Sequence, residues 1–184
     1  MNEIMWAIGR AGGIVSLGLF TLVLVLGIVS RSGRTLLGLP RFSVALVHRS
    51  TALTAVVFLA LHVGTLLLDP HAKLALPDVV VPFIAAWNPF WVGLGTVALD
   101  LVLALVVTGL LRQRLGQRVF RTIHWAAYGM WPIGLAHALG TGTNAVDLWF
   151  QAYAWGCAGA VACAVVWRLS AGFAETSAAR LGRA

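Results

Sequence analysis

Long apolar stretches alternate with short polar connections along this chain. An α-helix rises 1.5 Å per residue, so about 20 apolar residues cross the roughly 30 Å hydrocarbon core of a bilayer. Stretches of this length, with few charged residues, recur through most of the sequence. The pattern predicts an all-α integral membrane protein with about five transmembrane helices, at residues 11–29, 44–68, 87–111, 119–139 and 147–171.

The composition agrees with this fold class and narrows the function. Of the 184 residues, 60% are hydrophobic and 10% are charged, which excludes an ordinary soluble domain. We expect a single transmembrane domain over residues 1–184. A flavin-binding or nicotinamide-binding domain needs several alternating strands and helices, so we expect this chain to bind neither cofactor.

Basic residues recur in alternate connections. The net charge is +7, yet this distribution follows the positive-inside rule of membrane proteins and argues against a nucleic-acid partner. The connections near residues 31–41 and 112–121 and the C-terminal tail are rich in arginine, whereas Asp147 carries the only charge of the last connection. We therefore predict a multi-pass protein in contact with lipid, with its N-terminus outside and its C-terminus cytoplasmic.

Two further features concern the source and the longest connection. Lys73 is the one lysine among thirteen basic residues, a bias typical of GC-rich genomes, which indicates a bacterial plasma membrane.

The connection at residues 69–86 contains Pro70, Pro77 and Pro82 among apolar residues. It predicts a short segment at the membrane interface.

The main signal of function is a set of four histidines inside apolar stretches. His48 and His62 lie fourteen residues apart in the second stretch, and His124 and His137 lie thirteen apart in the fourth. Ionisable side chains are costly in hydrocarbon, and neutral imidazole is a common ligand of haem iron. The two stretches run in the same direction, so His48 and His124 share a depth near the cytoplasmic face. His62 and His137 lie about 20 Å further out.

This spacing predicts two bis-histidine haem sites, although any single membrane histidine could equally be a hydrogen-bonded packing residue. Fourteen residues turn an ideal helix to within about 40° of four full turns, so His48 and His62 share a face. Thirteen residues leave His124 and His137 about 140° out of phase on an ideal helix. We expect Pro132 to change the winding between them, because proline permits a kink in a membrane helix.

The pattern H-x13-H on one helix and H-x12-H on the next but one resembles the ferric reductase-like transmembrane domain family, which includes NADPH oxidases and ferric reductases. Residues 121–128 (RTIHWAAY) are similar to the entry of its histidine-bearing helix. The similarity extends from about Gly13 to Arg168. It implies a haem-binding bundle in which His48 and His124 bind an inner haem b, and His62 and His137 bind an outer one.

The resemblance also implies transmembrane electron transfer. Large members of the family continue into flavin and nicotinamide domains, which we do not find here, and six-helix members have one span more. The chain is therefore similar to single-domain bacterial members, such as the haem-binding subunit of the methionine sulfoxide reductase system. A separate reductase or the quinone pool would then supply electrons, and an acceptor at the outer face would receive them.

Two further groups of residues have two possible roles each. Basic side chains near the cytoplasmic face could bind haem propionates or only anchor the helices. Aromatic residues between His124 and His137 could contact porphyrin or fill space. These residues are Arg41, Arg49 and Arg121 for the first group, and Trp125, Tyr128 and Trp131 for the second.

Two functions of other classes stay open. A complete quinone-dependent or metal-reducing enzyme could use His71 and Asp69 of the outer loop, or Asp100. We expect Asp100 to be buried in the third span, where it could relay protons or join helices by hydrogen bonds. We expect His71 itself to be solvated. A haem-free scaffold would instead pack through the small residues of the first span, Gly9, Gly12, Gly13 and Gly18.

Overall fold

A computed structural model describes residues 2–32 and 40–173, which form seven α-helices and no β-strand. Four of the helices are long and apolar enough to cross a membrane. They confirm the all-α membrane fold and overlap the predicted spans at residues 11–29, 44–68, 87–111 and 147–171. The helices are α1 (Asn2–Ser32), α2 (Arg41–Leu68), α3 (Leu76–Val80), α4 (Pro89–Leu110), α5 (Arg112–His124), α6 (Ala127–Thr141) and α7 (Leu148–Leu169).

The predicted span at residues 119–139 is not one continuous helix. It comprises the end of α5 and most of α6, and the two are separated by a turn at Trp125 and Ala126. Here backbone N–H groups bond carbonyls three residues back, as in Tyr128 N–H to Trp125 O at 3.1 Å and Gly129 N–H to Ala126 O at 3.0 Å. Such bonds give about 3.0 residues per turn, so each residue rotates further than in an α-helix.

A change of winding therefore lies upstream of Pro132, where the interval between the two histidines already departs from ideal α-helix. The kink at Pro132 stays a prediction. Pro132 itself lies inside α6. A proline has no N–H for the carbonyl four residues earlier, which is that of Tyr128, and its ring crowds that carbonyl. Extra rotation between Thr122 and Gly129 brings a thirteen-residue interval closer to four whole turns, which puts the two histidines on one side.

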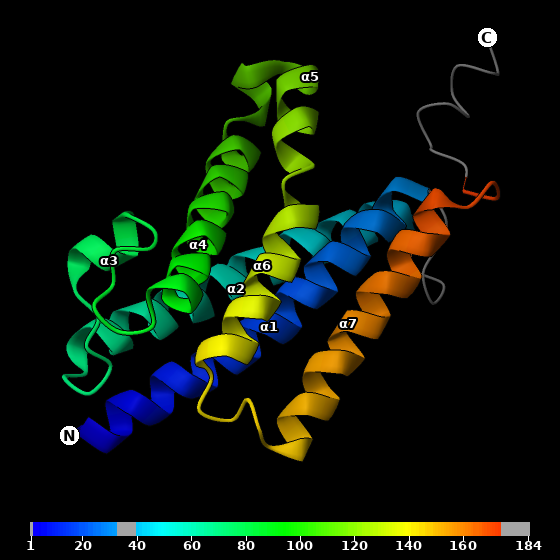
Figure 1. The fold of residues 1–184 in the computed structure, drawn as a ribbon. Coiled ribbons are helices and arrows are strands. Elements are labelled where there is room, and N and C mark those ends of the chain that lie inside the picture. Colours follow the sequence, from blue (N-terminus) through cyan, green and yellow to red (C-terminus); the bar gives the residue numbers. More distant parts are fainter. Residues whose placement is uncertain (1, 33–39, 174–184) are drawn as a thin grey trace, which may run out of the picture.

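The helices form a bundle (Figure 1), and the described residues at its two ends differ in charge. The N-terminus, α3 and the connection between α6 and α7 lie at one end, and α5 and the end of α7 lie at the other. We call the latter the arginine-rich end, and the former the opposite end. Described arginines at the arginine-rich end are Arg31, Arg49, Arg112, Arg114, Arg118, Arg121 and Arg168.

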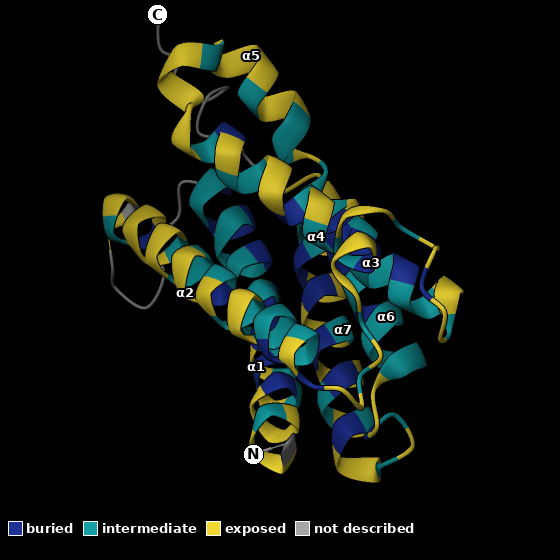
Figure 2. Ribbon diagram, turned by 90° about the vertical axis from the view of Figure 1, so that its left-hand side faces the viewer, coloured by how far each residue is buried: buried dark blue, intermediate teal, exposed yellow. Residues whose placement is uncertain are grey.

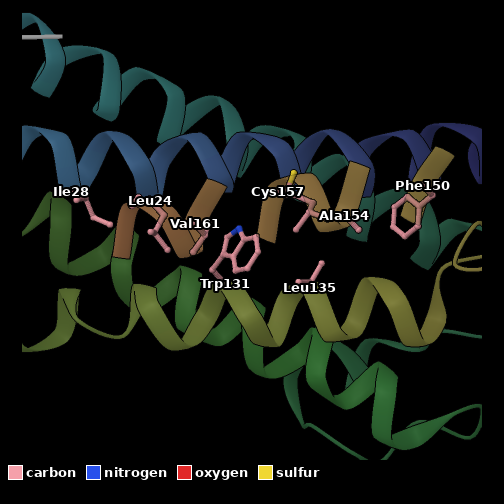
Figure 3. Close-up of a cluster of buried hydrophobic side chains, with 10 residues drawn as sticks. Leu24, Ile28, Trp131, Leu135, Phe150, Ala154, Cys157 and Val161 are labelled. Carbon is pink, nitrogen blue, oxygen red and sulfur yellow. The ribbon is translucent and has the colours of Figure 1, made fainter. Parts of the chain in front are cut away.

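The helix α1 is the centre of the packing, because it contacts α2, α6 and α7. Its Leu24 and Ile28 pack with residues of α6 and α7, including Trp131 and Phe150 (Figure 3). Hydrogen bonds add direction to this apolar contact. Trp131 Nε1–H donates to Thr21 Oγ1 at 2.9 Å, and the Tyr153 hydroxyl of α7 donates to the Ile14 carbonyl at 2.7 Å. In membranes such interhelical bonds contribute about 0.6 kcal/mol each.

The outward side of α2 is largely exposed (Figure 2). Its exposed apolar residues include Leu46, Leu53, Val57 and Leu61, at spacings that keep them on one side of a helix. The hydrocarbon of a bilayer would cover this apolar side. The helix α2 thus faces lipid on one side and α1 on the other.

Close approach of α1 and α2 depends on small residues. A methyl group built on Gly12 would lie 3.2 Å from the Phe58 carbonyl oxygen and 3.3 Å from the His62 backbone nitrogen. Both atoms belong to the backbone of α2, so they cannot move aside without separating the helices. Glycine at this position lets the two backbones touch.

We predict that Gly12→Val destabilises the protein by about 1–3 kcal/mol, the usual cost of overpacking a tight contact. The matched control is Gly64→Val in α2, where a Cβ meets no other atom within 4 Å. Unfolding of both variants in mixed micelles with increasing SDS measures the difference. Equal midpoints for the two variants would contradict the close helix contact.

Candidate functional site

The four membrane histidines meet as two pairs. The ring centres of His48 and His124 are 6.4 Å apart with the ring planes at 71°, and those of His62 and His137 are 6.5 Å apart at 77°. The first member of each pair belongs to α2, and the second belongs to α5 or α6. Fourteen residues of α2 separate the pairs by about 20 Å along its axis. The pair His48 and His124 lies toward the arginine-rich end.

Three of the four rings are anchored by the same kind of hydrogen bond. The Nδ1 atoms of His48, His62 and His137 lie 2.9, 2.6 and 2.8 Å from the carbonyl oxygens of Val23, Gly9 and Trp91. A carbonyl only accepts, so Nδ1 carries the proton and donates. The neutral ring then keeps its lone pair on Nε2, which is the atom left for a metal.

The same three rings lie against glycines of the neighbouring helices. A methyl group on Gly27 would lie 3.2 Å from His48 Cε1, and one on Gly13 would lie 2.9 Å from His62 Nδ1. A methyl group on Gly95 would lie 2.5 Å from His137 Cε1. Each glycine follows the accepting carbonyl by four residues, so it is one helical turn further along the same face. We call this unit of glycine and carbonyl a histidine cradle.

His124 differs from the other three. Its Nδ1 is buried and has no hydrogen-bond partner among the residues that the structure describes. Its ring stacks on Phe120, one turn earlier in α5, with the ring centres 4.9 Å apart and the planes at 29°. His124 is also the last residue of α5.

The geometry of each pair suits one metal atom between two imidazoles. At a metal–nitrogen distance of about 2.0 Å on each side, two axial rings place their centres about 6 Å apart. Within the described residues no group of three or more His, Cys, Asp or Glu side chains could hold a metal ion. A structural zinc site requires four protein ligands, whereas a porphyrin supplies four nitrogens and leaves two axial positions for histidine. The donor set therefore fits haem.

A cavity of about 550 Å³ adjoins His62 and His137. This volume is in the range of cofactor pockets, roughly 300–1,000 Å³. Its walls are mostly apolar and come from α1, α2, α4 and α6, with Leu17, Phe20 and Val102 among them. Its lining also includes Arg10 and Lys73, two cations that could neutralise the carboxylates of a bound cofactor.

Sequence reasoning missed Arg10 and Lys73 as site residues. Arg10 precedes the first apolar stretch, and its guanidinium carbon lies 4.8 Å above the Trp6 ring. Lys73 lies in the connection after α2, with a positive φ of 50°. The available signal was that both are cations at the end of the bundle where positive charge is otherwise scarce.

The predicted arginines have no established role in the site. Arg49 is exposed and adjoins His48, and Arg121 is exposed and precedes His124 by three residues. The side chain of Arg41 lies outside the described residues. Arg31, at the end of α1, is half-buried and within electrostatic range of His124. A role in binding propionates stays a prediction for Arg41, Arg49 and Arg121.

The expected burial of Asp100 is wrong. Asp100 is exposed in the middle of α4, because α3 covers only the first turns of that helix, where the Thr96 hydroxyl donates to the Asp78 carbonyl at 2.6 Å. A position in the middle of a span does not determine which side of the helix faces the bundle. His71 is exposed, as expected, with Nδ1 at 3.2 Å from Asp69 Oδ1.

The aromatic residues after His124 have separate roles. Trp131 is buried in the core of the bundle and also lines the cavity. Trp125 and Tyr128 instead surround the Arg168 guanidinium of α7, whose carbon lies 4.8 and 5.6 Å from the two ring centres. These cation–π contacts attach the start of α6 to the end of α7.

The anchoring bonds predict a tautomer for each ring. In haem-free protein, His48, His62 and His137 should carry their proton on Nδ1, because each bonds a carbonyl. Solid-state NMR of protein labelled with 15N-histidine, in the His71→Asn variant so that four histidines remain, measures this directly. A protonated Nε2 at these three positions would contradict the arrangement.

Comparison with known proteins agrees with a transmembrane fold. Residues 12–135, more than half of the chain, match the family described as ferric reductase like transmembrane component. No curated protein and no solved structure matches. The matched region includes α2, α4, α5 and three of the four paired histidines, and ends two residues before His137. The chain therefore belongs to the ferric reductase-like transmembrane family.

Proposed function

We propose that this chain is a transmembrane electron-transfer subunit that binds two b-type haems, one between His48 and His124 and one between His62 and His137. Membership of the family supports a role in electron transfer across a membrane. The observation that carries the haem assignment is the pairing of the rings at 6.4 and 6.5 Å. Their separation along α2 suits a relay with one centre near each face of the bilayer.

The residues that would hold each haem decide what it can do. His48 with His124, and His62 with His137, would each hold one haem, which would then supply electron exchange and not substrate binding. When bound, haem supplies a one-electron iron couple. The backbone carbonyls of Val23, Gly9 and Trp91 orient three of the four rings. The apolar walls keep water away from the site.

Cations at both ends support the same assignment. Propionate carboxylates form strong charge-assisted hydrogen bonds with arginine and lysine. Arg10 and Lys73 line the cavity beside His62 and His137, and we assign them to the haem there. Arg31 is the half-buried candidate for the haem of the arginine-rich end, together with the exposed Arg49 and Arg121.

The direction of transfer follows from topology. We propose that the arginine-rich end is cytoplasmic in a bacterial plasma membrane, as the positive-inside rule requires, with the N-terminus outside. A separate reductase or a quinol would deliver electrons at this end. An acceptor at the opposite end would receive them. The resemblance to single-domain members of the family that serve methionine sulfoxide reduction supports this arrangement.

The purified protein should show a Soret band and two haems b per chain, each low-spin. His48→Ala and His124→Ala should remove the haem of the arginine-rich end, while His62→Ala and His137→Ala should remove the other. Pyridine haemochrome assay and EPR measure the loss, which should approach one haem per chain. The matched control is His71→Ala, an exposed histidine outside both pairs, which should keep both haems.

A preparation that stays colourless after expression with excess haem would overturn this function and leave the haem-free scaffold. Turnover of quinol or iron chelates by the isolated chain would favour a complete reductase. Haem reduction without turnover supports the subunit.

The topology makes its own prediction. Single cysteines introduced in a background of Cys157→Ser and Cys163→Ser should react from the outside at Lys73 and from the cytoplasm at Arg114. A membrane-impermeant maleimide applied to intact cells should label only the first. Labelling of the Arg114 position in intact cells would reverse the assigned orientation.

A further inference from the structure

Two pairs of glycines repeat the interval of the histidines. Gly13 and Gly27 lie fourteen residues apart in α1, and Gly95 and Gly109 lie fourteen apart in α4. Fourteen residues return an α-helix to nearly the same face. Each helix therefore presents two glycines on one side, about 20 Å apart, which is the separation of the two histidine pairs.

The register of the helix hairpins relates these glycines to the histidines. Moving fourteen residues forward along α1, from Gly13 to Gly27, accompanies a step of fourteen residues back along α2, from His62 to His48. This is the register of an antiparallel helix pair. The same step forward along α4, from Gly95, reaches Gly109. A step of thirteen residues back from His137 reaches His124.

Gly109 and the carbonyl four residues before it have the parts of a histidine cradle, but no histidine ring lies against them. Gly109 is half-buried, and a methyl group built on it would meet no other atom within 4 Å. The carbonyl four residues before it is that of Leu105. His124 has its Nδ1 buried and without a partner in the described part of the chain. Gly109 therefore has no histidine ring against it, and the His124 ring has no acceptor for its Nδ1–H among the described residues.

We propose that Gly109 and the Leu105 carbonyl form the cradle of His124, which the ring enters when haem binds at the arginine-rich end. The inference rests on the proposed haem function. His124 Nδ1–H then donates to the Leu105 carbonyl, as the other three histidines donate to Val23, Gly9 and Trp91. All four axial rings acquire the same support.

The Leu105 carbonyl is suited to accept this bond. A carbonyl oxygen has two lone pairs, and helix formation uses one. The neighbouring Thr108 hydroxyl donates chiefly to the Ala104 carbonyl at 2.6 Å and reaches Leu105 O only at 3.3 Å. A second donor can therefore approach Leu105 O from the side of Gly109, where a Cβ would stand in the way.

The backbone around His124 can supply the movement. His124 ends α5, and the turn at Trp125 and Ala126 separates it from α6. At the other end of the segment, Gly116 has a φ of 75° and interrupts α5. These two breaks allow the part of α5 between them to shift relative to α4 and α6. His137 lies beyond both breaks and already contacts its cradle at Gly95.

The bond has a consequence for the iron. A hydrogen bond from Nδ1 raises the basicity of an imidazole ligand and fixes its orientation. A more basic ligand stabilises ferric iron over ferrous iron. A blocked cradle should therefore weaken binding of this haem and raise its reduction potential.

The test is Gly109→Ala in the full chain reconstituted with haem, with haem content, redox titration and EPR as readouts. We expect the haem of the arginine-rich end to bind at least tenfold more weakly or to shift upward in potential, with altered g values, while the other haem is unchanged. Gly27→Ala, which faces His48 at 3.2 Å, should perturb the same haem. Gly159→Ala in α7, where a Cβ meets nothing within 4 Å, is the matched control.

If Gly109→Ala matches Gly159→Ala with both haems unchanged, the cradle is wrong while the haem function stands. Absence of haem from the unsubstituted chain would instead remove the proposed function. A second measurement does not depend on the variant folding. In 15N-histidine protein carrying His71→Asn, reduced low-spin haem should give four hydrogen-bonded Nδ1–H groups, against three without haem. Three in both states would overturn the cradle.

Discussion

A histidine inside a bilayer has two nitrogens to satisfy and no water to help, and this constraint organises the bundle. Each of three rings donates a hydrogen bond from Nδ1–H to a carbonyl of a neighbouring helix. The carbonyl is already part of a helical ladder, so the bond needs a close approach of ring and backbone. Glycine one turn further along permits that approach, because a Cβ there would lie 2.5 to 3.2 Å from the ring.

The helix α1 combines this support with the packing of the whole bundle. One side holds His48 and His62 of α2 through Val23 and Gly9. Another side packs on α6 and α7 through Leu24 and Ile28. A single rigid helix thus sets the position of both α2 histidines relative to the rest of the protein. Substitutions in the α1–α7 contact should accordingly be felt at the histidine pairs even though they touch neither ring.

The opposite side of the site is built less uniformly. His137 is held by α4 in the same way as the α2 histidines, whereas His124 belongs to a short helix between two breaks. The consequence is an asymmetry between the two ends of the bundle. The pair near Arg10 and Lys73 has a formed cavity, and the pair near Arg31 includes His124, the one paired histidine whose Nδ1 has no partner among the described residues.

The sequence by itself determined how deep each histidine lies along the membrane normal. The tertiary structure decided which way each side chain faces. Residue number times helical rise sets how far His48 lies from His62 along the membrane normal, so apolar stretches and intervals were enough to predict which histidines would meet. The side of a helix that faces the bundle cannot be read in this way, because it depends on contacts between distant segments. The exposure of Asp100, the turn at Trp125 and the approach of Arg10 and Lys73 to the cavity follow from how α3, α4 and α6 pack, which no local pattern encodes.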